Sequence, residues 1–262
     1  MKVALIQIDI KRGDTEVNYA HALEMMRQAL AIEKKPDVLV LPEMWNIGYA
    51  LKQLSQKADV DGTETKRILQ EFAQKNDVNI VAGSVATNKA GKFYNTNYVF
   101  SRNGQIINDY DKVHLFGLMQ EDRFISSGTQ RSNFNLDEIP ASAVICYDIR
   151  FPEWLRTLMA QGSQILFVSA QWPVPRIKQW EILLQARAIE NQAYVVAVNR
   201  VGDERRDSFN GHSMVIDPLG NIVVQAKSEA EEIVYADLDL EQVAKVRGVI
   251  PVFNDRRPEL YR

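Results

Sequence analysis

The chain has 262 residues, of which 46% are hydrophobic and 25% are charged, a composition typical of globular proteins rather than of disordered or collagen-like chains. Its 31 basic and 34 acidic side chains give a formal charge of −3, so no overall basic field attracts nucleic acid or an anionic membrane. One cysteine excludes an internal disulfide framework and a zinc site built on several thiolates. We therefore expect a protein that acts on a small molecule, with no nucleic acid and no membrane among its partners.

Short runs rich in Val and Ile alternate with helical patterns along the chain. The predicted strands cover residues 3–9, 38–41, 79–85, 98–101, 143–146, 165–169, 194–199, 214–217 and 233–238. The predicted helices cover residues 18–31, 63–75, 152–161 and 179–191. Strands that alternate with helices indicate the α/β class, in which apolar strands are covered on both faces.

The organisation of the chain is that of one continuous unit. No Gly/Ser-rich or Pro-rich linker interrupts the alternation, so we expect a single domain over residues 1–262, with residues 240–262 as a tail at an oligomer interface. The charged run at residues 203–207 is interpreted as a solvated loop. The first residues show no signal-peptide pattern, and no apolar run approaches the ~20 residues of a membrane span, so we expect a cytoplasmic protein.

A weak internal repeat refines the expected architecture. Residues 93–100, with a turn at residues 102–104, resemble residues 209–216, with a turn at residues 218–220. Both patterns indicate β-hairpins, because Asn-Gly and Pro-Leu-Gly are turn sequences. Two similar halves predict two mixed β-sheets packed face to face, with helices outside.

The single cysteine, Cys146, lies between a predicted strand and the helix that opens at Pro152. Ligands in α/β sheets bind at the carboxyl ends of strands, and the free N–H groups of such a turn stabilise an oxyanion. Taken alone, the position favours a buried structural cysteine, and the neighbouring charged residues described next change that interpretation. The three histidines, His21, His114 and His212, have no metal-binding spacing, and we expect no metal.

Two further charged residues follow predicted strands. Glu43 comes directly after Pro42, which ends its strand, and its apolar neighbours favour a desolvated carboxylate suited to acid–base chemistry. Lys112 lies among aromatic and apolar residues, where an ammonium lowers the pKa of a thiol and binds an oxyanion. The alternatives are a solvated surface glutamate and an ordinary lysine whose head group reaches water.

Three segments resemble the signature segments of the nitrilase, or carbon–nitrogen hydrolase, superfamily: LPEMW (residues 41–45), YDKVHLF (residues 110–116) and ICYDIRFPEW (residues 145–154). They occur in the order Glu, Lys, Cys that this family shows. Residues 185–192 and 250–253 also match, so that the resemblance covers nearly the whole chain. One such segment alone is a weak signal, whereas three in order are specific.

The resemblance implies a four-layer αββα sandwich, a homodimer or larger homo-oligomer, and a Cys–Glu–Lys triad that needs no metal or organic cofactor. By this resemblance Cys146 is the nucleophile, Glu43 the general base and acid, and Lys112 the oxyanion stabiliser. Glu121 is the best match to a second active-site glutamate of the family. The backbone N–H of Tyr147 is expected to hold the oxyanion with Lys112.

Within the superfamily, the chain is most similar to the ω-amidase branch, which converts 2-oxoglutaramate and 2-oxosuccinamate to the 2-oxo acids and ammonia. That similarity rests on the segments above and on residues 170–176, 186–195 and 250–261. Such a substrate carries a carboxylate at the end remote from its amide. Its pocket therefore needs a cation beside a short apolar channel.

Several residues are candidates for that pocket. Arg176 is the candidate cation, although an arginine at a helix start or at an interface fits the same position. Tyr49, Phe116 and Trp172 are the expected walls. Arg150 is interpreted as a structural residue paired with a nearby carboxylate.

Other functions remain open at this point. An N-carbamoyl amino acid or N-carbamoylputrescine amidohydrolase uses the same triad, and nitrile hydrolysis is less favoured because no segment is specific to it. A catalytically silent family member would serve as a binding protein. A Cys–His hydrolase would use His114 or His212 as its base.

Overall fold

The structure is a computed structural model that describes residues 1–204 and 207–261. Its strands form two main sheets and one small ribbon. The first sheet runs in the order β16-β1-β2-β4-β6-β5-β3, with β7 paired to β6. Its strands are β1 (Lys2–Gln7), β2 (Val38–Val40), β3 (Asp59–Val60), β4 (Asn79–Val81), β5 (Val85–Lys89), β6 (Lys92–Phe100), β7 (Ile106–Asp111) and β16 (Glu232–Asp237).

The second sheet runs in the order β15-β14-β11-β10-β9-β8. Its strands are β8 (Asn133–Leu136), β9 (Ile139–Ile145), β10 (Ile165–Ala170), β11 (Tyr194–Asn199), β14 (Met214–Ile216) and β15 (Ile222–Gln225). The central strands β9, β10 and β11 are parallel. The ribbon pairs β12 (Val201–Glu204) with β13 (Asp207–Asn210).

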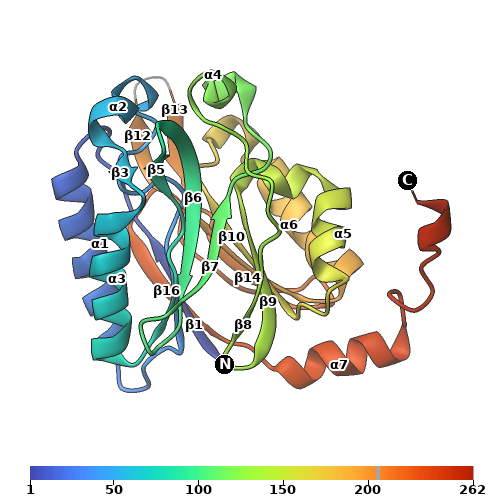
Figure 1. Cartoon of the computed structure of the whole chain (residues 1–262). Helices are drawn as coiled ribbons and strands as arrows, with labels where there is room; N and C mark the ends of the chain where they lie inside the picture. Colours follow the sequence, from blue (N-terminus) through green and yellow to red (C-terminus); the bar gives the residue numbers. More distant parts are fainter. Residues whose placement is uncertain (205–206, 262) are drawn as a thin grey trace.

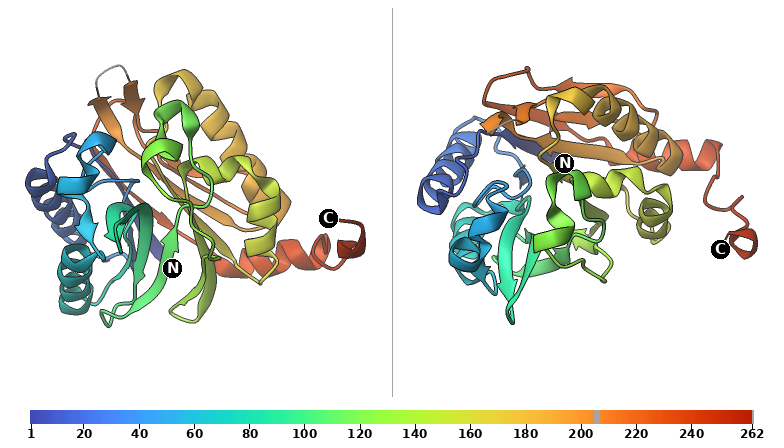
Figure 2. Two further views of the ribbon diagram at one scale, coloured as in Figure 1. Left: turned by 45° about the horizontal axis from the view of Figure 1, so that its top comes forward. Right: turned by 90° about the horizontal axis from the view of Figure 1, so that it is seen from above.

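The helices lie outside the two sheets (Figure 1). On one side are α1 (Thr15–Leu30), α2 (Leu54–Lys57) and α3 (Thr63–Asn76), and on the other are α5 (Pro152–Met159) and α6 (Ile177–Asn191). The short helix α4 (Glu121–Phe124) lies at the upper end of the sheets. Figure 2 shows α7 (Leu240–Val249) and the residues after it extending away from the body of the molecule.

The packing of apolar side chains explains these layers. Between the sheets, Val3 and Leu5 of β1 are buried in one cluster with Phe167 of β10 and Val196 of β11. The opposite faces of the same strands pack on helices, since their side chains alternate between the two faces. The first sheet packs in this way on α1 and α3, and the second on α5 and α6. The predicted four-layer αββα sandwich is therefore confirmed.

Both expected hairpins are present, in β6–β7 and in β14–β15. The second is shorter than expected, because Phe209 and Asn210 belong to the separate ribbon. The solvated-loop interpretation of residues 203–207 is wrong for Glu204, which is buried and whose carboxylate pairs with the guanidinium groups of Arg12 and Arg200, each at 2.8 Å. Arg205 and Arg206 lie outside the described residues.

Within residues 1–204 and 207–261, none of the helices combines the length and apolar character that crossing a bilayer requires. The extent of the domain and the role of the tail at an interface remain predictions.

Candidate active site

Cys146 occupies a sharp turn at the carboxyl end of β9. The strand ends at Ile145, and a 3₁₀-helix (Cys146–Arg150) leads directly to α5. The φ angle of Cys146 is +46°, a value that residues with a side chain seldom adopt. The thiol is almost fully buried, and its Sγ lies 4.0 Å from the main-chain oxygen of Gln171. The packed surroundings hold the turn in this strained conformation and so keep the thiol at the end of the strand.

Glu43 lies just beyond β2 and is fully buried, which excludes the surface-glutamate alternative. Its Oε1 accepts hydrogen bonds from Lys112 Nζ at 2.8 Å, Asn95 Nδ2 at 2.9 Å and the Tyr49 hydroxyl at 3.0 Å. Its Oε2 accepts one from the backbone N–H of Gln171 at 2.8 Å. Since Gln171 follows β10, this last bond joins the ends of strands from different sheets.

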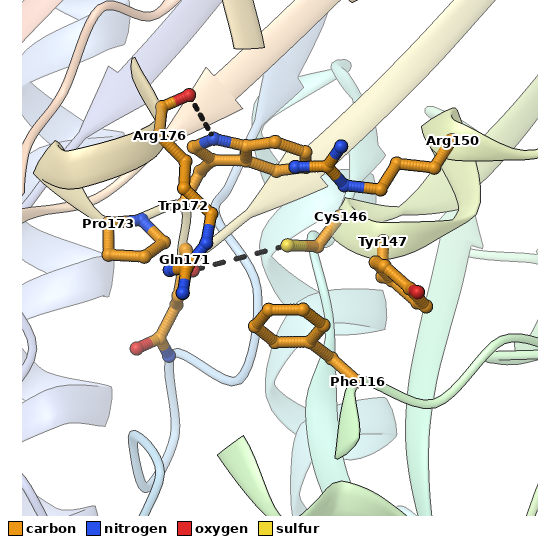
Figure 3. Close-up of a pocket in the computed structure, with 8 residues that line it drawn as sticks. All are labelled: Phe116, Cys146, Tyr147, Arg150, Gln171, Trp172, Pro173 and Arg176. Atoms are coloured by element: carbon orange, nitrogen blue, oxygen red, sulfur yellow. Dashed lines mark hydrogen bonds between the residues drawn. The ribbon is translucent and has the colours of Figure 1, made fainter. Parts of the chain in front are cut away.

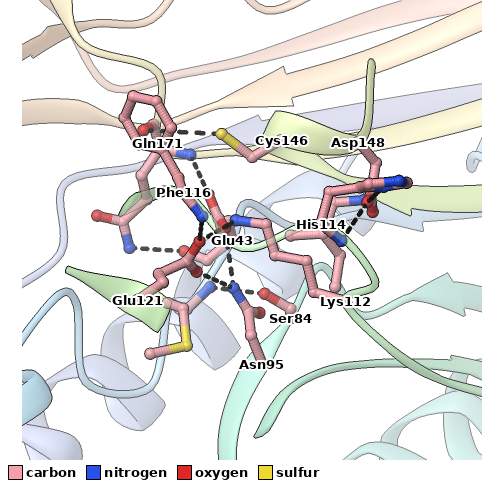
Figure 4. A network of polar contacts seen from close by, with 12 residues as sticks. Glu43, Ser84, Asn95, Lys112, His114, Phe116, Glu121, Cys146, Asp148 and Gln171 are labelled. Atoms are coloured by element: carbon pink, nitrogen blue, oxygen red, sulfur yellow. Dashed lines mark hydrogen bonds and ion pairs between the residues drawn. The ribbon is translucent and has the colours of Figure 1, made fainter. Parts of the chain in front are cut away.

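Lys112 follows β7 and is also fully buried, so its head group does not reach water. Its Nζ lies 2.8 Å from Glu43 Oε1 and 2.8 Å from Glu121 Oε2 (Figure 4). Its backbone N–H donates to Asn95 O on the neighbouring strand β6. The ammonium is therefore fixed between two carboxylates.

Glu121 begins α4 and completes this cluster. Besides Lys112, its Oε2 accepts the backbone N–H of Phe116 at 2.7 Å. Its Oε1 accepts hydrogen bonds from Asn95 Nδ2 at 3.1 Å and the Tyr49 hydroxyl at 3.2 Å. The carboxylates of Glu43 and Glu121 thus share three donors, which belong to Tyr49, Asn95 and Lys112.

Burial and charge set the protonation of these groups. Burial opposes the charged form of Lys112, but the carboxylates of Glu121 and Glu43 outweigh it and raise the pKa of the ammonium. Burial also raises the pKa of the Cys146 thiol, and the negative charge of Glu43 adds to this against the opposing effect of Lys112. The resting thiol therefore stays protonated at neutral pH. Any reaction that uses the thiolate therefore needs a base to remove this proton.

A small pocket adjoins Cys146 (Figure 3). Its lining consists of Phe116, Cys146, Tyr147, Arg150, Gln171, Trp172, Pro173 and Arg176. The expected wall residues Phe116 and Trp172 and the candidate cation Arg176 are therefore brought together beside the thiol. Tyr49 is not part of this lining, because its hydroxyl is directed to Glu43 and Glu121 instead.

The two arginines of the pocket have different surroundings. The guanidinium of Arg176 lies over the ring of Phe116, 5.6 Å from its centroid, and has no hydrogen-bond or ion-pair partner among the described residues. Arg150 was expected to pair with a nearby carboxylate, but among the described residues its guanidinium has an amide partner instead. Its Nη2 donates to Gln179 Oε1 at 2.5 Å, and its guanidinium stacks 4.7 Å from the centroid of Trp172.

The histidines lie apart from the pocket lining. The Nδ1 atom of His114 pairs with Asp148 Oδ1 at 2.8 Å, and that of His212 with Glu181 Oε1 at 2.7 Å. This arrangement does not support a Cys–His hydrolase. In the described part of the chain, no group of three or more His, Cys, Asp and Glu side chains is arranged to hold a metal ion.

The sequence analysis did not identify Asn95 or Gln171. Asn95 lies within the first hairpin, and no local pattern distinguishes it from the other polar residues there. Gln171 follows β10 directly, so the rule that places ligands at the carboxyl ends of strands would have found it.

Replacing Lys112 with Met tests how far the site depends on its ammonium. Breaking a buried ion pair typically costs about 3–5 kcal/mol, and here Glu43 and Glu121 both lose their cation. Burial raises the pKa of Glu121, and Lys112 opposes that rise, so the substitution raises it further. The folded variant then holds a proton that the unfolded chain releases, and its stability falls as pH rises above the ordinary pKa of Glu.

We therefore expect the loss of unfolding free energy in Lys112→Met to be larger at about pH 7.5 than at about pH 5, as measured by urea unfolding. The control is Lys89→Met, which removes a partly exposed ammonium that pairs with Asp109 and Asp111. In this variant we expect a loss of unfolding free energy of about 1 kcal/mol or less. Equal losses at the two pH values in Lys112→Met would contradict the prediction.

Comparison with known proteins agrees with this geometry. The chain is 45% identical over 259 residues to the 2-oxoglutaramate amidase of Bacillus subtilis (strain 168), covering 99% of this chain and 98% of that protein. It is 32% identical over 269 residues to the omega-amidase NIT2 of Homo sapiens, covering 99% and 96%. The crystal structure of Saccharomyces cerevisiae Nit3, a member of branch 10 of the nitrilase superfamily, superposes with a TM-score of 0.91 at 28% identity, covering 98% of this chain and 96% of that one. Residues 2–248 match the carbon-nitrogen hydrolase family model, and the chain belongs to this family of enzymes.

Proposed function

We propose that this enzyme hydrolyses the terminal amide of a small carboxylate-bearing compound, of the 2-oxoglutaramate or 2-oxosuccinamate type, to the acid and ammonia. The observation that carries the proposal is the pocket itself. It is lined by a buried thiol and by the guanidinium of Arg176, which has no hydrogen-bond or ion-pair partner in the described part of the chain. The activities for which the Bacillus and human relatives are named support the same substrate class.

In the first half-reaction, Glu43 takes the proton of Cys146 as the sulfur attacks the amide carbon. The resulting oxyanion accepts hydrogen bonds from Lys112 Nζ and from the backbone N–H of Tyr147, the residue that follows the nucleophile in the turn. The C–N bond then breaks, and Glu43 gives its proton to the departing ammonia. A thioester on Cys146 remains.

In the second half-reaction, Glu43 accepts a proton from water as the water oxygen attacks the thioester carbon. The oxyanion forms again at the same donors, the C–S bond breaks, and the thiolate recovers the proton from Glu43. Throughout both steps, Glu121 holds the ammonium of Lys112 in place through its 2.8 Å contact.

The substrate carboxylate is the second part of the proposal. Within the described residues, the pocket lining includes Arg176 and Arg150 but no Asp or Glu. Because Arg150 is committed to Gln179 and Trp172, Arg176 is the guanidinium that can form a charge-assisted pair with the remote carboxylate. The aromatic rings of Phe116 and Trp172 enclose the short chain between the carboxylate and the amide.

The first test is ammonia release from 2-oxoglutaramate by the wild-type protein beside Cys146→Ala. We expect robust release by the wild type and a loss of about 10⁴-fold or more in the variant, since the thioester cannot form without the sulfur. Circular dichroism checks that the variant is folded. Release by Cys146→Ala at the wild-type rate contradicts the nucleophile assignment, and hydrolysis of N-carbamoyl compounds alone contradicts the substrate class.

Arg176→Ala tests the carboxylate site. Loss of one charge-assisted interaction predicts a fall of about 10–100-fold in kcat/KM for 2-oxoglutaramate, carried mainly by KM. A neutral straight-chain amide of similar length should show little change. Arg150→Ala is the matched comparison, and a charge-specific loss in that variant instead of Arg176→Ala would mean that the assignment of Arg176 is wrong.

We also propose that two copies of the chain associate through the outer face of α6 and the C-terminal tail. Ile182 and Ile189 are more than half exposed on α6. Past α7 the tail projects from the body, and Leu260 and Tyr261 are exposed there as well (Figure 2). Exposed apolar side chains on a helix face and on a projecting tail are typical of surfaces that pack against another protein chain.

The double substitution Ile182→Glu with Ile189→Glu places two charges on that face. We expect it to convert a dimer or larger oligomer into a monomer, as measured by light scattering after size-exclusion chromatography, because charges are costly at an interface core. Val60→Glu serves as the control, since Val60 is equally exposed but lies on β3 in the other sheet. A wild-type monomer, or an unchanged mass in the double variant, would refute this proposal.

A further inference from the structure

Asp148 is a fully buried carboxylate that the mechanism above does not use. It accepts four hydrogen bonds. Its Oδ2 accepts the hydroxyl of Tyr110 at 2.8 Å and the backbone N–H of Ile145 at 3.0 Å. Its Oδ1 accepts the Nδ1 of His114 at 2.8 Å and the backbone N–H of the same residue at 3.1 Å.

The origin of these donors is informative. Tyr110 and His114 lie two residues before and two residues after Lys112. Ile145 directly precedes Cys146, and Asp148 itself is two residues beyond it. The Asp148 carboxylate therefore hydrogen-bonds to residues on both sides of Lys112. It also binds the residue before Cys146, while Asp148 itself follows Cys146 in the same turn. Figure 4 shows the pair formed by Asp148 and His114.

Other contacts fix the same donors. The ring of His114 stacks on Phe151, at the end of the cysteine turn, with 3.7 Å between centroids and 10° between planes. The hydroxyl of Tyr110 accepts a hydrogen bond from Trp154 Nε1 at 3.3 Å, in the first turn of α5. Both donors are thus held against the element that follows Cys146.

We propose that Asp148 is a positioning residue that sets the distance between the Cys146 thiol and the Lys112 ammonium, with Tyr110 and His114 as the donors through which it acts. The proposal rests on the roles assigned to Cys146 and Lys112 in the proposed function. It also gives His114 a structural task, that of a hydrogen-bond donor, in place of proton transfer.

The physical consequence is specific to the chemical step. Lys112 must meet the oxyanion that forms as the sulfur attacks, and a displacement of about 1 Å in such a group costs about 100-fold in rate. Among the described residues, no hydrogen bond or ion pair joins Asp148 to the pocket residues Arg176 and Trp172, so substrate binding is expected to change little. Loss of the carboxylate should therefore lower kcat and leave KM nearly unchanged.

The experiment compares four variants with the wild type and Cys146→Ala, using the amide that the wild type hydrolyses. Asp148→Asn keeps the shape but replaces one acceptor oxygen by a donor, and a fall of about 100-fold in kcat is expected. Tyr110→Phe and His114→Ala each remove one hydrogen-bond donor to Asp148, and we expect kcat to fall about tenfold in each variant. His114→Asn keeps an N–H near the position of Nδ1 and should recover most of the loss in His114→Ala.

Thermal unfolding shows which variants are folded. If Asp148→Asn is not folded, Tyr110→Phe, His114→Ala and His114→Asn test the positioning role instead. A folded Asp148→Asn variant with kcat within about twofold of wild type overturns the proposal. So does a His114→Asn variant as inactive as His114→Ala, which would indicate proton transfer by the imidazole. A change in KM alone overturns it as well.

Alkylation of Cys146 by iodoacetamide separates this proposal from the proposed function. We expect alkylation about tenfold slower in Asp148→Asn, because a displaced Lys112 stabilises the thiolate less. If the wild type hydrolyses no amide, the proposed function fails, while slower alkylation still supports the positioning role. An unchanged alkylation rate contradicts that role.

Discussion

The candidate active site depends on one buried ammonium, that of Lys112, held between the buried carboxylates of Glu43 and Glu121. Removing Lys112, Glu43 and Glu121 from water is costly, and ion pairing alone does not repay that cost. The remaining lone pairs are satisfied by the Tyr49 hydroxyl, the Asn95 amide and the backbone N–H groups of Phe116 and Gln171. These fixed dipoles replace part of the water that the carboxylates lose on burial and so offset part of its cost.

This requirement explains why the site forms where the two sheets meet. Glu43, Asn95 and Lys112 come from the ends of first-sheet strands or from within them, whereas Cys146 and Gln171 follow strands of the second. The hydrogen bond from Gln171 to Glu43 spans 128 positions of sequence and exists only once the sheets have packed. The apolar cluster between the sheets is therefore also what fixes the distance between the Glu43 carboxylate and the Cys146 thiol.

The limits of prediction from the sequence follow from the same geometry. The strand and helix patterns, the two hairpins and the three charged or nucleophilic positions carry local signals, such as a proline that ends a strand or a turn before a helix. Asn95 and the true surroundings of Tyr49 and Arg150 carry none, because their roles arise from contacts between distant segments. Glu204 shows the same limit, since a charged run that favours a solvated loop contains a residue paired with two arginines in the interior.

The raised pKa of Cys146 fits the charge of the proposed substrate. Burial and the adjacent Glu43 keep the thiol neutral at rest, so no thiolate stands in the pocket when an anionic substrate enters. A thiolate formed in advance would repel the substrate carboxylate across a small pocket of low dielectric constant. When the proton moves only as the sulfur attacks, the new negative charge passes directly to the carbonyl oxygen. The Lys112 ammonium, which is charged before the reaction begins, can then stabilise that oxygen. Under the proposed function, the high pKa of the nucleophile is therefore an advantage, and Arg176 remains available for the carboxylate alone.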